Sequence, residues 1–302
     1  MLAGGTGGAK LARGMLDVVG PDELVVIANT GDDIDIYGAH VSPDPDLVSF
    51  WLADEIDERG WGLRDDTFAV MDALRALGHD VWFRLGDRDL AWCLERRRLL
   101  DEGLRATEAL ARLNKAIGVR VAVLPMSDEP QSTRVRTDEG WRPFQEFMIR
   151  DGATAPVHGV AFGEPGASPT PPTPEVLAAL RNARAVIVGP SNPVISIWPI
   201  LHSLGAALAD LTAPVVYVSP VVAGQIVKGP TAAFLNVYDQ PVSAAGVTAF
   251  YEAVAPGLLN GVVSDEALTD LPTLQIDTAM PDAIARARVA EQTLAFALSF
   301  AV

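Results

Sequence analysis

The sequence predicts an α/β protein with a Rossmann-like, mainly parallel sheet, helices on both faces of that sheet, and a helical cap. Three observations support this fold class. Apolar runs alternate along the chain with helical patterns, as they do in βαβ units. These runs are continuously apolar, which is typical of strands in a sheet that is covered on both faces. A polar or Gly/Pro-rich segment follows each run, and in open α/β sheets such segments carry the ligand site.

Five apolar runs are the expected strands, at residues 24–28, 81–85, 119–124, 185–188 and 215–218. A sixth and very short run, residues 1–3, precedes a glycine-rich segment. Because only three residues stand before Gly4, this first strand looks clipped, and the position of the natural start stays open. Leu11 and Leu16 belong to the helical pattern that follows the glycines.

From about residue 46 to residue 118 the pattern is largely helical, and we interpret this stretch as a cap on one α/β unit that spans residues 1–302. Its clearest apolar helix faces consist of Phe68, Met71, Leu74 and Leu77, and of Leu110, Leu113 and Ile117. Gly78 and Gly118 follow these faces, and glycine favours helix ends. Residues 164–174 are too rich in proline for regular structure, so we expect an exposed loop there.

Composition limits the possible function classes. The chain has 302 residues, of which 49% are hydrophobic and 21% charged, so it can bury a large core without disulfides or structural metals. Its net charge of -16 argues against nucleic-acid binding, which depends on clustered Lys and Arg. The same charge repels an anionic substrate unless cations compensate at the site, and we therefore expect a metal.

The only cysteine, Cys93, excludes a disulfide framework and fits a reducing cytoplasm. Its apolar neighbours favour a buried structural thiol over a catalytic one. The sequence contains neither a signal-peptide pattern nor an apolar stretch of membrane-spanning length, so we expect a cytoplasmic protein without a membrane partner. None of the four histidines, His40, His79, His158 and His202, has a spacing typical of a zinc site or a catalytic triad, so none receives a role.

The first candidate binding segment is Gly4-Gly5-Thr6-Gly7-Gly8-Ala9-Lys10. Glycines allow backbone N–H groups to approach an anion, and the helix start behind them adds partial positive charge. The segment does not match the P-loop pattern, because Lys10 lies between Ala9 and Leu11 and not between Gly and Ser or Thr. It does not match the G-x-G-x-x-G fingerprint either, because Lys10 stands where the third glycine would fall. We predict that Gly4, Gly5, Thr6, Gly7, Gly8 and Lys10 bind a nucleotide phosphate. The alternative is a turn that only joins a strand to a helix.

Two acidic segments are the candidate metal and catalytic residues. Asn29-Thr30-Gly31-Asp32-Asp33 directly follows the run 24–28, and its two carboxylates suit Mg²⁺. A solvated turn is the alternative, since Asn, Gly and Asp are common turn residues. Ser42-Pro43-Asp44-Pro45-Asp46 is a stiff segment whose last carboxylate, Asp46, is either a helix N-cap or a ligand.

Two later segments also follow expected strands. Arg84-Leu85-Gly86-Asp87-Arg88-Asp89 carries alternating charges, which are typical of solvated ion pairs but which here also stand at a strand's carboxyl end, where substrate is expected. Gly189-Pro190-Ser191-Asn192-Pro193 offers backbone N–H groups, a hydroxyl and an amide that suit a diphosphate or a base. An ordinary capped turn is the alternative for this second segment.

Taken in order along the chain, these segments and Arg59-Gly60-Trp61-Gly62 resemble the 2-phospho-L-lactate transferase family, called CofD in methanogens and FbiA in actinobacteria. The resemblance implies a CofD-like fold. It also implies transfer of a 2-phospholactyl or enolpyruvyl-phosphoryl group from its GDP-linked donor to the ribityl hydroxyl of the deazaflavin Fo. The products are coenzyme F-420-0, or its dehydro form, and GMP. Mg²⁺ is the implied cofactor, and a homodimer is the usual assembly.

The resemblance also implies roles for individual residues. The glycine segment together with Ser191, Asn192 and Pro193 lies around the nucleotide, while Asp32 and Asp33 hold the metal. Asp46 and Arg84 bind Fo, and we expect Asp87 and Arg88 beside them. Because displacement at phosphorus needs mainly positioning and charge neutralisation, we expect catalysis to depend on Asp32 through the metal and on Asp46, which would orient the Fo hydroxyl and accept its proton.

Two alternatives share part of this pattern. YvcK-like gluconeogenesis factors, which resemble nucleotide-sugar-binding regulators, have the glycine segment and the Asn29 to Asp33 region in common with the transferases. The segments around Asp46, Arg59 and Asp87 favour the transferase. A dinucleotide oxidoreductase is the second alternative, and the missing third glycine argues against it.

Overall fold

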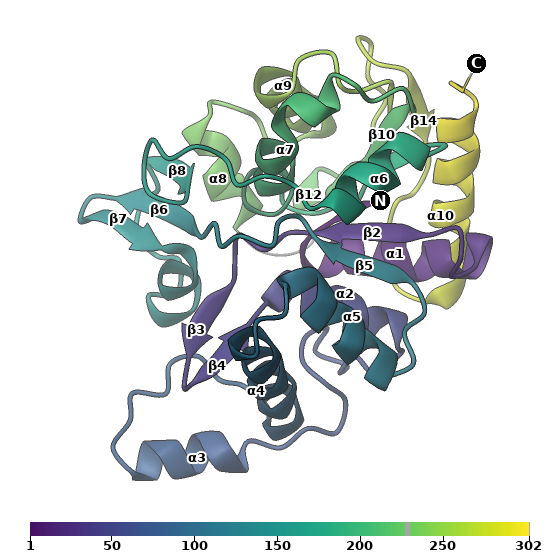
Figure 1. The fold of residues 1–302 in the computed structure, drawn as a ribbon. Helices are drawn as coiled ribbons and strands as arrows, with labels where there is room; N and C mark the ends of the chain where they lie inside the picture. Colours follow the sequence, from purple (N-terminus) through teal and green to yellow (C-terminus); the bar gives the residue numbers. More distant parts are fainter. Residues whose placement is uncertain (227–229, 302) are drawn as a thin grey trace.

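The computed structural model describes residues 1–226 and 230–301 and confirms the predicted α/β fold class (Figure 1). A seven-stranded sheet has the order β14-β13-β10-β9-β1-β2-β5, and all neighbouring strands in it are parallel. The strands are β1 (Leu2–Ala3), β2 (Val25–Ala28), β5 (Ala122–Pro125), β9 (Val186–Val188), β10 (Val215–Val218), β13 (Gly261–Ser264) and β14 (Thr273–Gln275). From β1 the chain first builds the sheet towards β5 and then returns to β9 on the other side. The strand order therefore reverses between β1 and β9, and ligands bind at the carboxyl ends of such a switch point.

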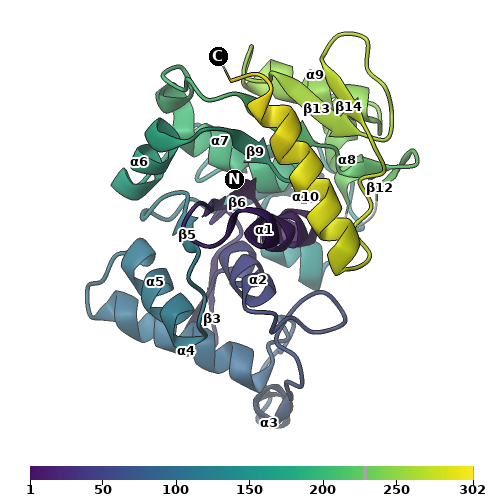
Figure 2. The same ribbon diagram turned by 90° about the vertical axis from the view of Figure 1, so that its right-hand side faces the viewer.

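Helices cover both faces of the sheet. Successive strand residues point to opposite faces, so neighbouring residues of one strand belong to two different cores. Leu2 and Ile27 belong to a core that contains α6 (Pro174–Asn182), α7 (Trp198–Leu204), α8 (Thr231–Val237) and α9 (Ala244–Val254). Ala3 and Val26 belong to a second core that contains α1 (Gly5–Val19), α2 (Pro43–Leu52) and α10 (Ala283–Leu298). Figure 2 shows α10 crossing beside α1 on this second face. Among the described residues, no helix combines the length and apolar composition that crossing a bilayer requires.

A third apolar core lies in the part of the chain that follows β2. It joins the antiparallel hairpin of β3 (Ile34–Ile36) and β4 (Ala39–Val41) to α3 (Ala69–Ala76), α4 (Asp87–Asp101) and α5 (Ala106–Ala116). Figure 1 shows these elements together below the sheet. Helices α3 and α5 confirm the two helices that the apolar spacing predicts before Gly78 and Gly118. The face predicted for α3 is only partly right, because Met71 is buried but Leu77 is 77% exposed.

The strand expected at residues 81–85 is wrong. This segment is irregular, with Phe83 and Leu85 buried in the third core and Arg84 exposed between them. The backbone N–H of Phe83 donates to the Tyr37 hydroxyl at 3.3 Å, so a side chain provides what a neighbouring strand would. The apolar run arises here from packing into the third core, and a short apolar run alone cannot distinguish such a segment from a buried strand.

The remaining elements surround this framework. An antiparallel sheet contains β6 (Thr133–Thr137), β7 (Gly140–Pro143) and β8 (Gly159–Phe162), and a small hairpin contains β11 (Val221–Val222) and β12 (Gln225–Ile226). Three short non-α helical segments are η1 (Glu146–Arg150), η2 (Pro193–Ile197) and η3 (Gly205–Leu208). Residues 164–173 contain no helix or strand, as their proline content predicts, and α6 begins only at Pro174.

Candidate active site

The candidate site lies at the carboxyl edge of the sheet, where β1, β2 and β9 end. Gly4 follows β1, Asn29 follows β2, and Gly189 follows β9. Because these three strands are adjacent and parallel, the segments behind them must emerge side by side at the point where the strand order reverses. The structure thus brings together three of the five segments that the sequence singles out, and Asp44 adds a fourth, the segment Ser42 to Asp46.

The glycines are the first turn of helix α1 and not a free loop. Helix α1 begins at Gly5, so the helix start lies within the glycines and not behind them. The glycines are needed because the segment after β9 presses against this turn. A Cβ atom on Gly7 would lie 2.0 Å from the Pro190 carbonyl oxygen, and one on Gly8 would lie 2.6 Å from Ser191 Oγ. The Ser191 hydroxyl completes this contact by donating to the Gly4 carbonyl oxygen.

Replacing Gly7 with alanine is expected to destabilise the fold by about 1–3 kcal/mol, because the added methyl group meets backbone atoms that cannot move aside. Urea unfolding followed by circular dichroism measures the effect. Gly159→Ala is the matched control, since its added Cβ would lie 3.7 Å or more from its neighbours. Equal stability of the two variants would contradict the tight packing of α1 against residues 189–191.

Asp44 connects these segments, although no role was predicted for it from the sequence. Its Oδ1 accepts from the Gly5 backbone N–H at 2.6 Å, and its Oδ2 accepts from Asn29 Nδ2 at 2.9 Å. Burial raises the pKa of Asp44 to about 6, although both hydrogen bonds act in the opposite direction. The only sequence signal for Asp44 was its position in the segment Ser42 to Asp46, whose last carboxylate, Asp46, was the predicted ligand.

Asp32 and Asp33 lie in the turn after β2. Asp32 is 7% exposed, and its Oδ1 has no hydrogen-bond partner among the described residues. Burial, together with the negative charge of Asp44, raises the pKa of Asp32 well above its usual range. Burial also raises the pKa of Asp33, which accepts a hydrogen bond from Ser42 Oγ at 2.7 Å and lies 3.3 Å from His40 Nε2.

The residue types here suit a divalent cation, although the ligand atoms of the three carboxylates do not all lie within 4.8 Å of one another. The buried Asp32 and Asp44 and the half-buried Asp33 repel one another electrostatically, and Asp32 Oδ1 is buried without a hydrogen-bond partner among the described residues. Carboxylate oxygens are the ligands that Mg²⁺ prefers, and a cation would offset the repulsion that raises their pKa values. The donor set therefore fits the predicted metal.

The segment after β9 also retains unused binding capacity. Asn192 Oδ1 accepts from the backbone N–H groups of Val194 and Ile195, so Asn192 caps the helical segment that begins at the buried Pro193. The Asn192 Nδ2 group and the Thr30 hydroxyl are buried and have no partner among the described residues. Buried donors without partners are costly, and a ligand at this edge would satisfy them.

Lys10 and Thr6 lie farther along α1 than the Gly4 and Gly5 backbone. Lys10 Nζ donates to the Met280 carbonyl oxygen at 3.4 Å and lies 5.7 Å from the centre of the Trp51 ring. The structure thus places Lys10 against α2 and the segment before α10. Thr6 is half-buried in the first turn of α1.

Asp46 is held in a buried ion pair. Its carboxylate accepts from Trp92 Nε1 at 2.7 Å and from both terminal nitrogens of Arg96. Asp46 is therefore not the N-cap of α2, which is Ser42, but lies inside that helix with both oxygens engaged. Arg96 also donates to the His40 carbonyl oxygen at 3.1 Å, so it joins Asp46 to the hairpin that carries Asp33's partner. No sequence pattern indicated Arg96.

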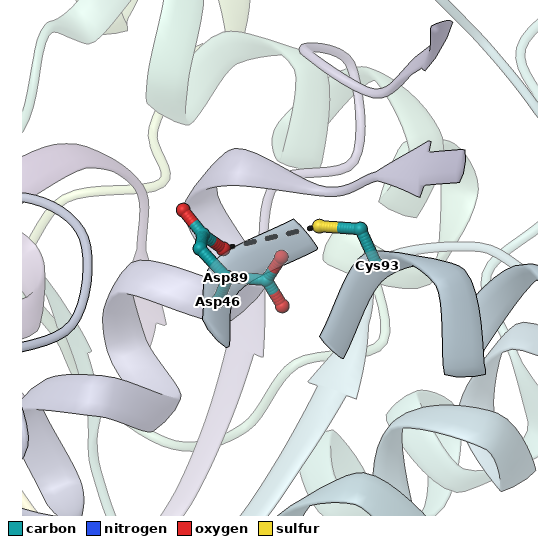
Figure 3. A group of neighbouring side chains, drawn as sticks. All are labelled: Asp46, Asp89 and Cys93. Carbon is teal, nitrogen blue, oxygen red and sulfur yellow. Dashed lines mark hydrogen bonds between the residues drawn. The ribbon is translucent and has the colours of Figure 1, made fainter. Parts of the chain in front are cut away.

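Asp89 and Cys93 lie beside Asp46, as Figure 3 shows. Ligand atoms of Asp46, Asp89 and Cys93 lie within 4.8 Å of one another, and Cys93 Sγ donates to Asp89 Oδ1 at 3.9 Å. Because Arg96 already neutralises Asp46, a cation at this position would meet an occupied carboxylate. Burial raises the pKa of the Cys93 thiol, which agrees with the structural role expected for it.

The other charged candidates lie around the loop before α3. Asp87 accepts from the backbone N–H groups of Ala69 and Val70 at 3.0 and 2.9 Å, so it caps α3. Arg88 donates to the Arg64 carbonyl oxygen at 2.7 Å. Arg84 is exposed, and its guanidinium carbon lies 4.0 Å from the centre of the Phe68 ring.

Arg84 and Phe68 form one surface with Arg59 and Trp61. The guanidinium carbon of Arg59 lies 4.4 Å from the Trp61 ring centre and 5.5 Å from that of Phe68. Trp61 is 43% exposed and Arg84 is exposed, so both can meet a ligand, while Arg59 Nε already donates to Asp57 Oδ1 at 2.6 Å. We call these four residues the arginine–aromatic surface.

Comparison with known proteins gives a consistent result. The family model described as 2-phospho-L-lactate transferase CofD matches residues 1–287. The chain is 35% identical to the 2-phospho-L-lactate transferase of Methanopyrus kandleri, across 97% of this chain and 96% of that protein. It is 42% identical to the phosphoenolpyruvate transferase of Kitasatospora aureofaciens, across 88% and 84% of the two chains. A solved structure of a UPF0052 family member from Bacillus halodurans has a TM-score of 0.66 at 17% identity, covers 97% of each chain, and supports the fold alone.

Proposed function

Because the chain belongs to the 2-phospho-L-lactate transferase CofD family, we propose that it is a transferase that moves a 2-phospholactyl or enolpyruvyl-phosphoryl group from a GDP-linked donor to the ribityl hydroxyl of Fo. GMP is the leaving group. Some relatives are 2-phospho-L-lactate transferases and others are phosphoenolpyruvate transferases, and the two groups match this chain at similar identity. The proposal therefore includes both donors. The same relatives favour the transferase over a YvcK-like regulator or a dinucleotide oxidoreductase.

The observation that carries this proposal is the meeting of Gly4, Asp44 and Asp32 at the switch point of the sheet. The start of the 15-residue helix α1 directs backbone N–H groups and partial positive charge to this place, which suits the donor's diphosphate. The unused Asn192 amide and Thr30 hydroxyl offer further contacts to the nucleotide. Ser191 supports this binding indirectly, since its hydroxyl fixes Gly4.

Asp32 and Asp33 are the proposed ligands of Mg²⁺, and Asp44 contributes negative charge beside them. When bound, Mg²⁺ would neutralise charge on the diphosphate oxygens. The protein's own contribution is to orient these carboxylates. The Asn29 amide and the Gly5 N–H fix Asp44, and Ser42 with His40 fixes Asp33. Such preorganisation is the main need of a displacement at phosphorus, which demands little covalent help.

The acceptor is proposed to approach from the side of α4 and the arginine–aromatic surface. A planar deazaflavin ring is suited to stacking against Phe68 or Trp61, and Arg59 and Arg84 can pair with its polar edge. Asp46 was expected to accept the hydroxyl proton. Since Arg96 and Trp92 engage both of its oxygens, we now propose that Asp46 positions the cap elements that receive the acceptor.

The test is an incubation of purified protein with Fo, Mg²⁺ and either GDP-linked donor, followed by mass spectrometry. We expect the acidic deazaflavin product and GMP in equal amounts with at least one donor, and no product without Mg²⁺. Binding of a nucleotide sugar without turnover of either donor would favour the regulator instead.

Replacing Arg84 with leucine is expected to raise the KM for Fo about tenfold, which corresponds to the loss of one charged contact, and to leave the Tm unchanged. Arg84 is exposed, so its removal leaves no buried group without a partner. Steady-state kinetics measure the effect. Arg75→Leu on α3 is the control, because Arg75 is equally exposed and pairs only with Asp72 among the described ion pairs. An unchanged KM in the Arg84 variant would move the acceptor site elsewhere.

A further inference from the structure

Asp89 is a carboxyl group beside Asp46 that has no role in the acceptor or donor contacts described above. It lies in the first turn of α4 and is half-buried. Ligand atoms of Asp89, Asp46 and Cys93 lie within 4.8 Å of one another (Figure 3). Asp89 takes part in no ion pair among the described residues, whereas Arg96 pairs with Asp46. Two neighbouring carboxyl groups therefore have different surroundings, and only one of them is neutralised by a cation.

On one side, Asp89 is joined to the arginine–aromatic surface by the cap of α4. The Asp66 carboxylate accepts from the backbone N–H groups of Arg88 at 2.8 Å and of Asp89 at 3.0 Å. Asp66 stands two residues before Phe68 in the chain, and the Phe68 ring belongs to that surface. The start of α4, with Asp89 in it, is thus held next to the place where the acceptor ring is proposed to bind.

On the other side, Asp89 is joined to the donor end of the site through α2. Asp46, its neighbour, lies on the same helix as Asp44, and Asp44 accepts from the Gly5 backbone N–H at 2.6 Å. Gly5 begins α1, where the donor diphosphate is proposed to bind. An acceptor whose ring lies on the arginine–aromatic surface and whose hydroxyl reaches the donor therefore extends past Asp89.

The Asp89 carboxylate also has an oxygen to offer. Cys93 Sγ donates to Asp89 Oδ1 at 3.9 Å, and burial raises the pKa of this thiol, so Cys93 stays a neutral donor. No hydrogen bond joins the second oxygen, Oδ2, to another described residue. A carboxylate with one oxygen held and the other available can accept a proton from a hydroxyl within hydrogen-bond reach.

The charges around Asp89 suit this task. Burial, together with the negative charge of Asp46, raises the pKa of Asp89 to about 7. The charge of Asp66 acts in the same direction, while Arg96 and the hydrogen bond from Cys93 act in the opposite one. A proton acceptor is most effective when its pKa lies near the pH at which it works.

We propose that Asp89 is the catalytic residue that accepts the proton of the acceptor hydroxyl, a role that rests on the proposed transfer to Fo. The hydroxyl oxygen forms a bond to the donor phosphorus that carries the lactyl or enolpyruvyl oxygen, and its proton passes to Asp89 Oδ2. The bond from that phosphorus to GMP breaks, and the electron pair leaves with the GMP oxygen. Water then removes the proton and restores the carboxylate. Asp46, held by Arg96, positions α2 against α4.

Asp89→Asn is expected to lower kcat about 100-fold or more and to leave the KM for Fo and for the donor unchanged, because it removes only the proton acceptor. In the parent chain, kcat is expected to rise with pH up to about pH 7 as Asp89 ionises. The asparagine variant is expected to lack this rise. Asp89→Glu keeps a carboxyl group and is expected to restore part of kcat together with the rise. Steady-state kinetics below and above pH 7 measure all three chains.

Asp101→Asn is the matched control, since Asp101 lies on the same helix, is 56% exposed and pairs with Arg97. Its kcat is expected to equal that of the parent. The Tm gives a second result that needs no turnover. Because the pKa of Asp89 is raised in the folded chain, its ionisation costs stability as the pH rises towards 7. Asp89→Asn removes this cost and is expected to raise the Tm over the parent more at about pH 8 than at about pH 5.

Three outcomes overturn the proposal. The first is a parent-like kcat of Asp89→Asn above pH 7, and the second is a loss confined to the KM for Fo, which makes Asp89 a binding residue. The third is a Tm difference that does not change with pH, which shows that the folded chain does not oppose ionisation of Asp89. These outcomes leave the parent active. A parent that forms no product with either donor instead removes the proposed function, and the role of Asp89 with it.

Discussion

Asp32→Asn is expected to lower turnover by about three orders of magnitude, because it removes the charge of the buried carboxylate best suited to hold Mg²⁺. The fold is expected to survive. Asparagine keeps the size of the side chain, and the substitution relieves the repulsion between Asp32 and Asp44. Steady-state kinetics at saturating donor and Fo, across a range of Mg²⁺ concentrations, measure the loss.

Two comparisons separate the metal role from damage to the fold. Mg²⁺ is expected to raise the Tm of the parent chain and to leave that of the Asp32 variant unchanged, because an ion that binds only the folded state stabilises it. Asp72→Asn is the control, since Asp72 on α3 is 61% exposed and its ion pair among the described residues is with Arg75. Parent-like turnover of the Asp32 variant at high Mg²⁺ would remove Asp32 from the metal site.

Arg96→Met is expected to destabilise the chain by about 3–5 kcal/mol, because it leaves the buried Asp46 carboxylate without its cation. Methionine occupies much of the same space, so lost volume contributes little to this change. The side chains of Arg96 and Asp46 are 4% and 6% exposed, and water therefore cannot replace the lost contacts. Urea unfolding and the Tm both measure the effect.

The neighbouring residue provides a matched control. Arg97 is 39% exposed and pairs with Asp35 and Asp101 at the surface, so Arg97→Met is expected to cost about 0–1 kcal/mol. Adding Asp46→Asn to Arg96→Met is expected to restore part of the stability, since it removes the unpaired charge. Similar losses for Arg96→Met and Arg97→Met would show that the buried pair does not support this part of the fold.

The Arg96→Met variant also tests whether Asp46 positions the cap elements or takes part in the chemistry of the acceptor hydroxyl. If Asp46 only positions the cap elements, a temperature at which Arg96→Met stays folded should restore most of its turnover. A variant that is folded but inactive at every temperature would return Asp46 to the chemistry of the acceptor hydroxyl.

Continuous apolar runs located the central strands of the sheet because these strands are buried on both faces, but β13 and β14 at one edge were not predicted. The runs at residues 24–28, 119–124, 185–188 and 215–218 overlap β2, β5, β9 and β10, and the structure differs mainly at their ends. The run at 81–85 was misleading, because a short apolar run also arises when an irregular segment packs against helices. A single sequence cannot separate these two origins of one pattern.

The sequence by itself determined the fold class, the family and the segments that meet at the sheet's carboxyl edge, because local patterns and motif order are properties of the chain. Only the tertiary structure decided which carboxylates share that edge and what each contacts. Asp44 and Asp46 are two residues apart on one helix, yet the first meets Gly5 and Asn29 while the second meets Arg96. That difference comes from burial and from partners 15 to 50 residues away, which no spacing along the chain encodes.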